Sequence, residues 1–311
     1  MTQDYATGKV ILIGEHAVVY GRPAIAVPVM DVRAGVIVED AGGGSGITIY
    51  APDIGLTVDV SSAPADEPLS RTVRDALIHM GCEVGDVHLS LTIRSSIPVA
   101  SGLGSGTAVA TAIVRALSAH LNHSLDAATV SSIVYETEKI YHGTPSGIDN
   151  TVVSFEQPVY FCKGRPIVTF GVKRPFWLAI ADTGVPSLTR AAVADVRAAW
   201  QRDPAGHERI FDQIGSLADT ARRAIEKGKI ETLGVLMDEN HRLLRQLGVS
   251  SPELELLVGT ARHQGAGGAK LSGGGRGGNM IALVTPQNVE RVRQALIAAG
   301  ARNVIVTRVG R

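Results

Sequence analysis

The sequence is poor in aromatic side chains, which make up 4% of its 311 residues. Proteins that bind single-stranded nucleic acid stack bases on such side chains, so this shortage argues against a base-stacking surface. The charge is also balanced, because 30 Lys and Arg residues face 30 Asp and Glu residues. A chain with no net charge has no field to attract nucleic acid or an anionic membrane. We therefore expect neither as a partner.

Cysteines and long apolar runs are equally scarce. Cys82 and Cys162 are the only cysteines. They could form one bridge, but we favour two buried thiols in a reducing compartment. No run approaches the ~20 apolar residues of a membrane span, and the first residues do not have the form of a signal peptide. The sequence therefore predicts a cytoplasmic protein, whose 45% apolar composition can bury a large core in one or two domains.

Hydrophobic periodicity gives a coarse order of elements. Short strands are predicted in the first 60 residues, then helices over 70–80, from about 105, and over 126–141, then strands over 151–155 and 159–162. After a change of character near 165–175, we expect a strand over 177–181 and helices over about 187–202, 207–227 and 229–246. The end of the chain predicts strands over 268–272 and 279–284, a helix over 286–299 and a strand over 303–308. That ending looks like half of a split βαβ sandwich.

The run Gly102-Leu-Gly-Ser-Gly-Thr107 is the most informative motif, because it stands between a predicted strand and an Ala-rich helix. Glycines let backbone N–H groups turn inward, and the helix adds its positive dipole end, so the run can cradle phosphate. No Gly-Lys-Ser/Thr follows, and Thr107 stands where the dinucleotide fingerprint has its last glycine. The run by itself is equally compatible with a plain tight turn.

Two further segments carry side chains suited to chemistry. In Gly8–Gly21, Lys9 starts an apolar strand, and Glu15 and His16 fall in the turn after it. In Glu138–Asn150, Glu138 and Asp149 lie eleven residues apart at a helix end and a polar turn. One carboxylate could receive the proton of an acceptor hydroxyl and the other could bind Mg²⁺, which prefers hard oxygen ligands. A solvated lysine, a turn histidine and a helix-capping aspartate are the alternatives.

The fourth segment is a late glycine-rich stretch. Gly273 to Gly278 spells G-x-G-x-x-G, but a strand follows where the dinucleotide motif needs a helix, so that interpretation fails on context. A flexible hairpin is one alternative. The other is a loop whose backbone approaches phosphates from the side opposite the first glycine run.

Taken together, the four segments resemble the GHMP kinases. The three ordered motifs of that family appear here as Lys9–Tyr20, Pro98–Thr107 and Lys270–Gly278, so the resemblance spans essentially the whole chain. Within the family, Gly14–Ala26, His142–Asn150 and Asp182–Arg190 look like the members that phosphorylate mevalonate. The resemblance implies transfer of the γ-phosphoryl group of ATP to the C5 hydroxyl of mevalonate, with Mg²⁺ as the metal cofactor. Another kinase of the same pathway, acting on phosphomevalonate or at the 3-hydroxyl, and a non-catalytic ligand sensor are the alternatives.

The resemblance also implies a fold and a set of site residues. The fold is α+β, with residues 1–170 as an ATP-binding domain similar to domain 2 of ribosomal protein S5. Residues 171–311 form a ferredoxin-like split βαβ domain. Asp149 would be the catalytic aspartate, with Lys9 paired to it near the acceptor hydroxyl, and Glu138 the Mg²⁺ carboxylate. ATP would contact Pro98, Ala100, Ser101, Gly102, Leu103, Gly104, Ser105, Gly106, Thr107, Gly273 and Gly274, and mevalonate would contact Glu15, His16, Ser146 and Thr183.

This chain departs from the family pattern at several positions. Gly106 stands where the second loop serine, a usual Mg²⁺ ligand, is expected, so Ser105 or Thr107 would have to supply that hydroxyl. Arg276 stands in the late loop where relatives often have a small residue. These departures affect metal coordination and substrate choice, but not the fold. A homodimer is also possible.

Overall fold

The computed structural model describes residues 1–42, 46–98, 101–142 and 145–310. By contacts the chain forms two compact units built from interleaved segments. Unit 1 comprises Met1–Gly8, Val32–Val99 and Gly104–Glu156, and unit 2 comprises Lys9–Asp31, Ala100–Leu103 and Gln157–Arg311. The assignment of ATP binding to residues 1–170 and of a second domain to residues 171–311 stays a prediction.

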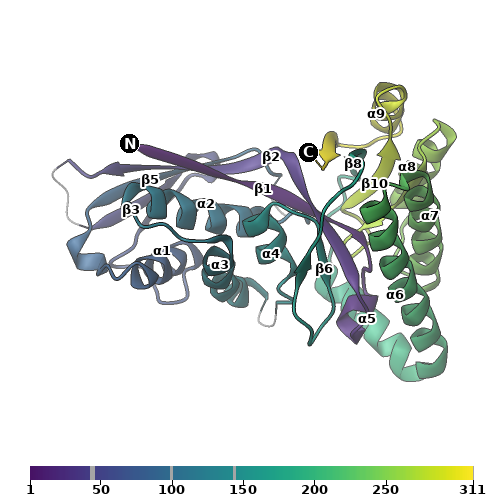
Figure 1. The fold of residues 1–311 in the computed structure, drawn as a ribbon, viewed down its shortest axis with the longest axis horizontal. Helices are drawn as coiled ribbons and strands as arrows, with labels where there is room; N and C mark the ends of the chain where they lie inside the picture. Colours follow the sequence, from purple (N-terminus) through teal and green to yellow (C-terminus); the bar gives the residue numbers. More distant parts are fainter. Residues whose placement is uncertain (43–45, 99–100, 143–144, 311) are drawn as a thin grey trace. The chain divides into compact units, whose positions relative to one another are not determined.

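A seven-stranded sheet contains the strands that lie before residue 170. They are β1 (Thr2–Ile13), β2 (Ala24–Asp40), β3 (Ile47–Ala51), β4 (Leu56–Asp59), β5 (Leu89–Ser95), β6 (Val159–Phe161) and β7 (Val168–Thr169). The order is β4-β3-β5-β2-β6-β7, with β1 beside β2 (Figure 1). Short strands were predicted in the first 60 residues, but β2 is one long strand of 17 residues, because Asp31 and Val32 continue the extended backbone through its middle.

Four helices belong to unit 1: α1 (Pro68–His79), α2 (Ser105–His120), α3 (Ala127–His142) and α4 (Ile148–Phe155). Figure 1 shows them gathered on one side of the strands of that unit. Helix α2 is buried along most of its length, with its small side chains Ala108, Ala112 and Ala116 fully covered. A buried helix directly after the glycine run agrees with the prediction.

The strand predicted over Thr151–Phe155 was wrong, because these residues form most of α4. The β-branched run Thr-Val-Val favours a strand locally. Three features start a helix instead: Gly147 takes the left-handed conformation at the N-cap, Asp149 lies in the first turn, and Thr151 Oγ1 donates to Gly147 O at 2.7 Å. Burial of Val152 and Val153 then stabilises the helix.

Unit 2 is built around a four-stranded sheet. Its elements are β8 (Phe176–Asp182), α5 (Thr189–Arg202), α6 (Pro204–Lys227), α7 (Ile230–Gln246), α8 (Pro252–His263), β9 (Gly268–Ser272), β10 (Asn279–Val284), α9 (Val289–Ala298) and β11 (Asn303–Val309). The order is β11-β8-β10-β9, with antiparallel neighbours throughout. Strands β8 and β9 therefore flank β10 with helices connecting them, which is the expected ferredoxin-like split βαβ arrangement.

The edge strand β9 is covered by α7. The two backbones meet without side chains between them, since a Cβ on Gly234 would lie 1.9 Å from the carbonyl oxygen of Gly267. Two side chains of α7 accept hydrogen bonds from β9: Asp238 Oδ1 from the Ala269 N–H at 2.8 Å and His241 Nδ1 from the Leu271 N–H at 3.3 Å. These bonds satisfy outward-facing amides that an edge strand otherwise exposes.

Two expectations about the whole chain can be compared with the structure. Cys82 and Cys162 are both free thiols, as favoured, although only Cys162 is buried and Cys82 is half-buried. Within the described part of the chain, no helix has both the length and the apolar character that a bilayer crossing requires.

Candidate active site

The start of α2 provides an uncapped helix N-terminus in unit 1. Gly104 is the N-cap residue in a left-handed conformation, and no side chain of the described residues caps the helix. The first backbone N–H groups of a helix lack partners within the helix and carry its positive dipole end. Ser105 is half-buried and Gly106 is exposed at this end. This end of α2 is therefore suited to bind an anion such as a phosphate group.

Thr107 and Glu138 meet behind the first turn of α2. The Thr107 hydroxyl donates to Glu138 Oε1 at 2.7 Å, and both residues are almost fully buried. The structure thus pairs two of the three predicted metal ligands, while the third, Ser105, lies one residue inside the N-cap. No group of three or more His, Cys, Asp and Glu side chains gathers as a metal site among the described residues. One carboxylate and one hydroxyl suit Mg²⁺, which often takes few protein ligands and completes its shell with phosphates and water.

Asp149 lies in the first turn of α4, the second helix N-terminus of unit 1 that carries a predicted site residue. Its side chain lies beside the positive end of the helix dipole, where negative charge is stabilised. Ser146 precedes the helix and is exposed, and its Oγ accepts from the Ile148 N–H at 3.3 Å. Asn150 is buried, and its side-chain amide donates to the backbone and the hydroxyl of Ser131 on α3. These bonds fix the turn that holds Asp149.

The turn after β1 holds Glu15 and His16 in unit 2, both buried. Its backbone is strained: His16 has φ +61°, a left-handed value that few side chains adopt without support. The His16 ring provides one support, since Nε2 donates to the carbonyl oxygen of Gly274 at 3.0 Å. Burial lowers the pKa of His16 below its usual value of 6.5, although Gly274 and Glu15 act in the opposite direction. At neutral pH the ring is therefore uncharged, with Nδ1 as its acceptor atom.

Glu15 is held by a buried cation. Lys270, on β9, donates to Glu15 Oε1 and to its own neighbour's carbonyl, Leu271 O, at 2.6 Å. Asn240, on α7, donates to Glu15 Oε2 at 3.0 Å. Lys270 and Glu15 are 0% and 1% exposed, so neither side chain contacts solvent. Burial lowers the pKa of Lys270, and the Glu15 carboxylate acts against that shift.

The late glycine-rich stretch is the hairpin loop between β9 and β10, as its sequence context predicts. Its carbonyl oxygens accept from three side chains: Gly274 O from His16, Gly275 O from Ser187, and Gly278 O from Thr183. Gly274 is buried, and a Cβ there would lie 2.6 Å from the Thr189 hydroxyl. Gly273 is half-exposed and has open space around its own Cβ position. The predicted pocket residues His16 and Thr183 are therefore brought to one loop.

Arg276 fixes the tip of this loop. Its backbone is left-handed, with φ +57°, and its N–H donates to Val249 O at 2.8 Å. The guanidinium binds the carboxylate of Asp195 on α5, and Nε donates to Gly248 O at 3.2 Å. These contacts compensate for the left-handed strain at Arg276.

The remaining predicted residues are divided between the units. In unit 2, the amide of the buried Lys9 donates to Leu103 O at 2.9 Å, and Asn279 on β10 donates to Ser101 O. Gly102 is left-handed, with φ +77°, as the turn requires. In unit 1, Pro98 is half-buried, whereas Ala100 lies outside the described residues. Lys9 belongs to unit 2 and Asp149 to unit 1, so their pairing stays a prediction.

Comparisons with known proteins identify the family to which this chain is similar. Residues 71–157 match the GHMP kinases N terminal domain, and residues 221–302 match the GHMP kinases C terminal domain. A mevalonate kinase of Pyrococcus abyssi is 38% identical over 96% of this chain and 93% of its own length. The chain belongs to the GHMP kinase family. The mevalonate kinase of Aeropyrum pernix is 36% identical, with 96% and 93% of the two chains covered.

Solved structures of GHMP kinases confirm the α+β fold. The crystal structure of L. major mevalonate kinase in complex with R-mevalonate superimposes with a TM-score of 0.86 at 28% identity, covering 100% of this chain and 96% of that one. The Methanococcus jannaschii mevalonate kinase has the same fold, with a TM-score of 0.85 at 23% identity over 98% and 96% of the chains.

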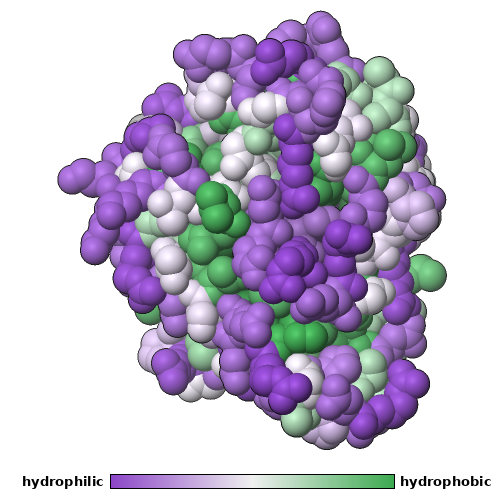
Figure 2. Space-filling model, turned by 90° about the vertical axis from the view of Figure 1, so that its right-hand side faces the viewer, coloured by the Kyte–Doolittle hydropathy of each residue, from purple (hydrophilic) through white to green (hydrophobic). Residues whose placement is uncertain are grey.

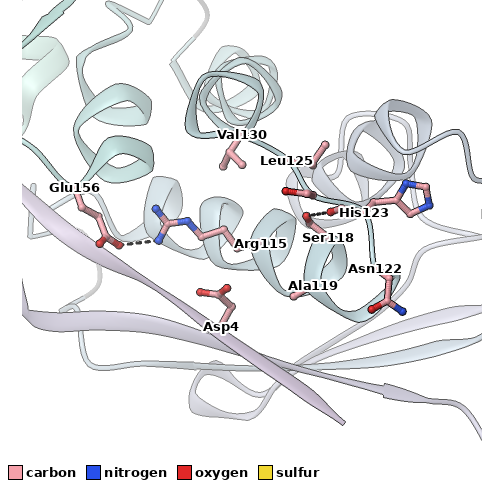
Figure 3. A pocket seen from close by; sticks show the side chains of 10 residues that line it. Asp4, Arg115, Ser118, Ala119, Asn122, His123, Leu125, Val130 and Glu156 are labelled. Atoms are coloured by element: carbon pink, nitrogen blue, oxygen red, sulfur yellow. Dashed lines mark hydrogen bonds and ion pairs between the residues drawn. The ribbon is translucent and has the colours of Figure 1, made fainter.

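A cavity of about 640 Å³ lies elsewhere in unit 1 of this GHMP kinase, between β1, the end of α2 and the end of α4 (Figure 3). None of the predicted site residues lines it. Its most prominent cation, Arg115, already donates to Glu156, Tyr5 O and Ser154 O. We therefore place the candidate site at the helix N-termini and glycine loops and not in this cavity.

Three polar residues of the site were missed by sequence reasoning: Lys270, Asn240 and Asn279. A lysine inside the apolar run of β9 was one available signal. Another was Asn240, which falls where the spacing of Leu233, Met237 and Leu244 on α7 expects an apolar side chain. Asn279 begins β10 directly after the glycines and gave no signal of its own.

Proposed function

We propose that this chain is an ATP-dependent mevalonate kinase, which transfers the γ-phosphoryl group of ATP to the C5 hydroxyl of mevalonate. The observation that carries the proposal is the full-length similarity to mevalonate kinases, at 38% identity over 96% of the chain. The arrangement of the site supports it, because phosphoryl transfer asks a protein mainly for positioning and for neutralisation of charge.

Unit 1 supplies groups for the triphosphate. The uncapped N-terminus of α2, at Gly104 to Thr107, binds phosphate oxygens through its backbone N–H groups. Glu138 and Thr107 would hold Mg²⁺, with Ser105 as the second candidate hydroxyl. When bound, the metal neutralises charge on the phosphates. Gly273 and Gly274 in unit 2, with Pro98, Ala100 and Ser101 to Leu103, complete the proposed nucleotide contacts.

Asp149 and Lys9 act on the acceptor. The Asp149 carboxylate orients the C5 hydroxyl and receives its proton, and the hydroxyl oxygen forms a bond to the γ-phosphorus. The bond between that phosphorus and the bridging oxygen breaks, and ADP leaves with the electron pair. Lys9 stabilises the negative charge that is shared between the hydroxyl oxygen and the phosphoryl group.

Mevalonate is recognised by neutral hydrogen-bonding groups. Neutral His16 offers Nδ1 as an acceptor, and Ser146 and Thr183 offer hydroxyls. Two cations of unit 2 that could bind a second phosphate already bind carboxylates: Lys270 binds Glu15, and Arg276 binds Asp195. This pairing favours mevalonate over its 5-phosphate as the substrate, because the extra phosphate would meet carboxylates without matching positive charge.

Self-association is also proposed, as a homodimer. Figure 2 shows a face on which apolar surface is divided into patches by hydrophilic side chains. Helices α7 and α8 each expose a large apolar side chain, Val235 at 67% and Leu256 at 55%. Light scattering after size-exclusion chromatography would give twice the chain mass of 32.6 kDa for a dimer.

A coupled assay of ADP release tests the substrate, with mevalonate, phosphomevalonate, homoserine and galactose compared at equal concentrations. We expect kcat/KM for mevalonate to exceed that for phosphomevalonate by at least ~10²-fold. Phosphorus NMR of the product separates a 5-phosphate from a 3-phosphate. Comparable rates on mevalonate and its phosphate, or a 3-phosphate product, would replace the proposal with a neighbouring kinase, and binding without turnover would leave a sensor.

A further inference from the structure

The buried pair of Lys270 and Glu15 connects two parts of unit 2 that are 255 residues apart in the sequence. Lys270 lies in β9, the strand that leads into the glycine-rich loop, and Glu15 lies in the turn that carries His16. Asn240 on α7 donates to the second carboxylate oxygen, at 3.0 Å. Both oxygens of Glu15 therefore bind protein donors inside the core of unit 2.

A buried ion pair is weak support for stability, because removing two charges from water costs about as much as their attraction returns. Apolar side chains of similar volume would hold the core of unit 2 at least as well. The pair is therefore better explained by a role in fixing the positions of the residues around it. Such pairs can fix one arrangement of a chain among several.

The turn beside the pair needs support of this kind. Gly14, with φ +113°, is pressed against Ala24, and His16 has the left-handed φ of +61°. A left-handed histidine persists only where the surroundings determine it. Its ring reaches Gly274 O, four residues after Lys270 on the same chain segment. The ion pair and the His16 bond thus fasten the same turn to the same strand and loop.

We propose that Lys270 is a positioning residue for mevalonate binding: by holding Glu15, it fixes His16 against the glycine-rich loop with Nδ1 available to the substrate. The inference rests on the proposed function and deepens it. It also changes the role of Glu15, which acts through the neighbouring His16 and not by contacting mevalonate.

The test uses the full chain and three variants of the pair. Lys270→Met leaves Glu15 charged in the core and should lower the melting temperature. Lys270→Met with Glu15→Gln removes both charges, so stability should recover by more than half of that loss. If the Lys270 variants do not fold, Glu15→Gln alone replaces them in the test. This variant should fold, because burial lowers the pKa of Lys270 and lets the unpaired amine lose its proton.

We expect the double variant, Glu15→Gln alone and His16→Leu each to raise the KM for mevalonate about 10-fold. The KM for ATP should stay within twofold of wild type in all three. The control removes an exposed pair of the same unit, Arg174 with Glu231, by Arg174→Met and Glu231→Gln, and should change neither KM. A stable double variant with a wild-type KM for mevalonate would overturn the inference. If the wild-type protein itself does not phosphorylate mevalonate, the proposed function is wrong. Failure of the proposed function is thus distinguished from failure of the positioning role of Lys270.

Discussion

Replacing Gly234 by alanine should destabilise the protein, although the same change usually stabilises a helix. Glycine inside a helix costs about 0.5–1 kcal/mol relative to alanine. Gly234 lies in α7, and an added Cβ would stand 1.9 Å from Gly267 O and 2.6 Å from the carbonyl carbon. Real Cβ contacts are essentially never under 3.0 Å, so α7 must move away from β9 by about the difference, 3.0 minus 1.9 or 1.1 Å.

The shift would lengthen bonds between α7 and the rest of unit 2, including those from the Ala269 N–H to Asp238 and from Asn240 to Glu15. Overpacking costs about 1–3 kcal/mol, and each weakened hydrogen bond adds about 1 kcal/mol. After subtraction of the helix gain, we expect a net loss of about 2–4 kcal/mol. For a unit of this size the melting temperature should fall by on the order of 5–10 °C.

Gly259 in α8 is a matched control, because it is exposed and a Cβ there has nothing within 4 Å. Gly259→Ala should raise stability by about 0.5–1 kcal/mol. Differential scanning fluorimetry of both variants, with kinetic constants for mevalonate, measures the contrast. The reasoning is refuted if Gly234→Ala melts at or above the wild-type temperature.

Three further predictions concern the reaction and its pH dependence. Asp149→Asn should leave the melting temperature unchanged and lower kcat by ~10²–10⁴-fold, and near-wild-type turnover would remove the proton acceptor from the mechanism. Thr107→Ala should raise the Mg²⁺ concentration for half-maximal rate by about 10-fold, and Ser105→Ala should raise it by less. Unchanged Mg²⁺ titration curves would exclude both hydroxyls as metal ligands. Burial holds the pKa of His241 at about 4, against 6.5 in the unfolded chain, so the unfolded state takes up the proton first as pH falls. His241 should therefore lower the free energy of unfolding by about 3 kcal/mol between pH 6.5 and 4. In urea titrations, His241→Asn should make the free energy of unfolding depend less on pH in this range, and an unchanged dependence would contradict the lowered pKa of His241.

Local sequence patterns correctly predicted helices and strands that depend mainly on their own sequence and little on distant contacts. The bounds of β9 and β10 match the prediction, because glycines delimit two short apolar runs. Helix α8 was missed, although Ser251 caps it and Pro252 occupies its first turn, because its apolar residues form the short cluster Leu254, Leu256, Leu257 and Val258, which is followed by the glycine-rich stretch. Local composition thus placed β9 and β10 correctly but missed two short helices, α4 and α8.

The site was predictable only as separate motifs. Thr107 and Glu138 were both named as metal ligands, but their hydrogen bond joins two helices that no spacing rule connects. The partners of Glu15 lie 225 and 255 residues away. Nothing within one segment indicates which lysine or asparagine will be buried against that carboxylate, since the choice depends on how α7 packs on the edge strand.

The interleaving of the two compact units has a consequence for synthesis on the ribosome. Residues 9–31 are made long before strands β9 and β10, yet both parts belong to unit 2. The bonds from Ser272 to Ile11 and from His16 to Gly274 close over 261 and 258 residues. Contacts of such long range slow folding, and they cannot form until residues 272–274 have been synthesised. The strained turn from Gly14 to His16 therefore lacks the support of the Gly274 carbonyl until that residue, 258 positions after His16, has been made.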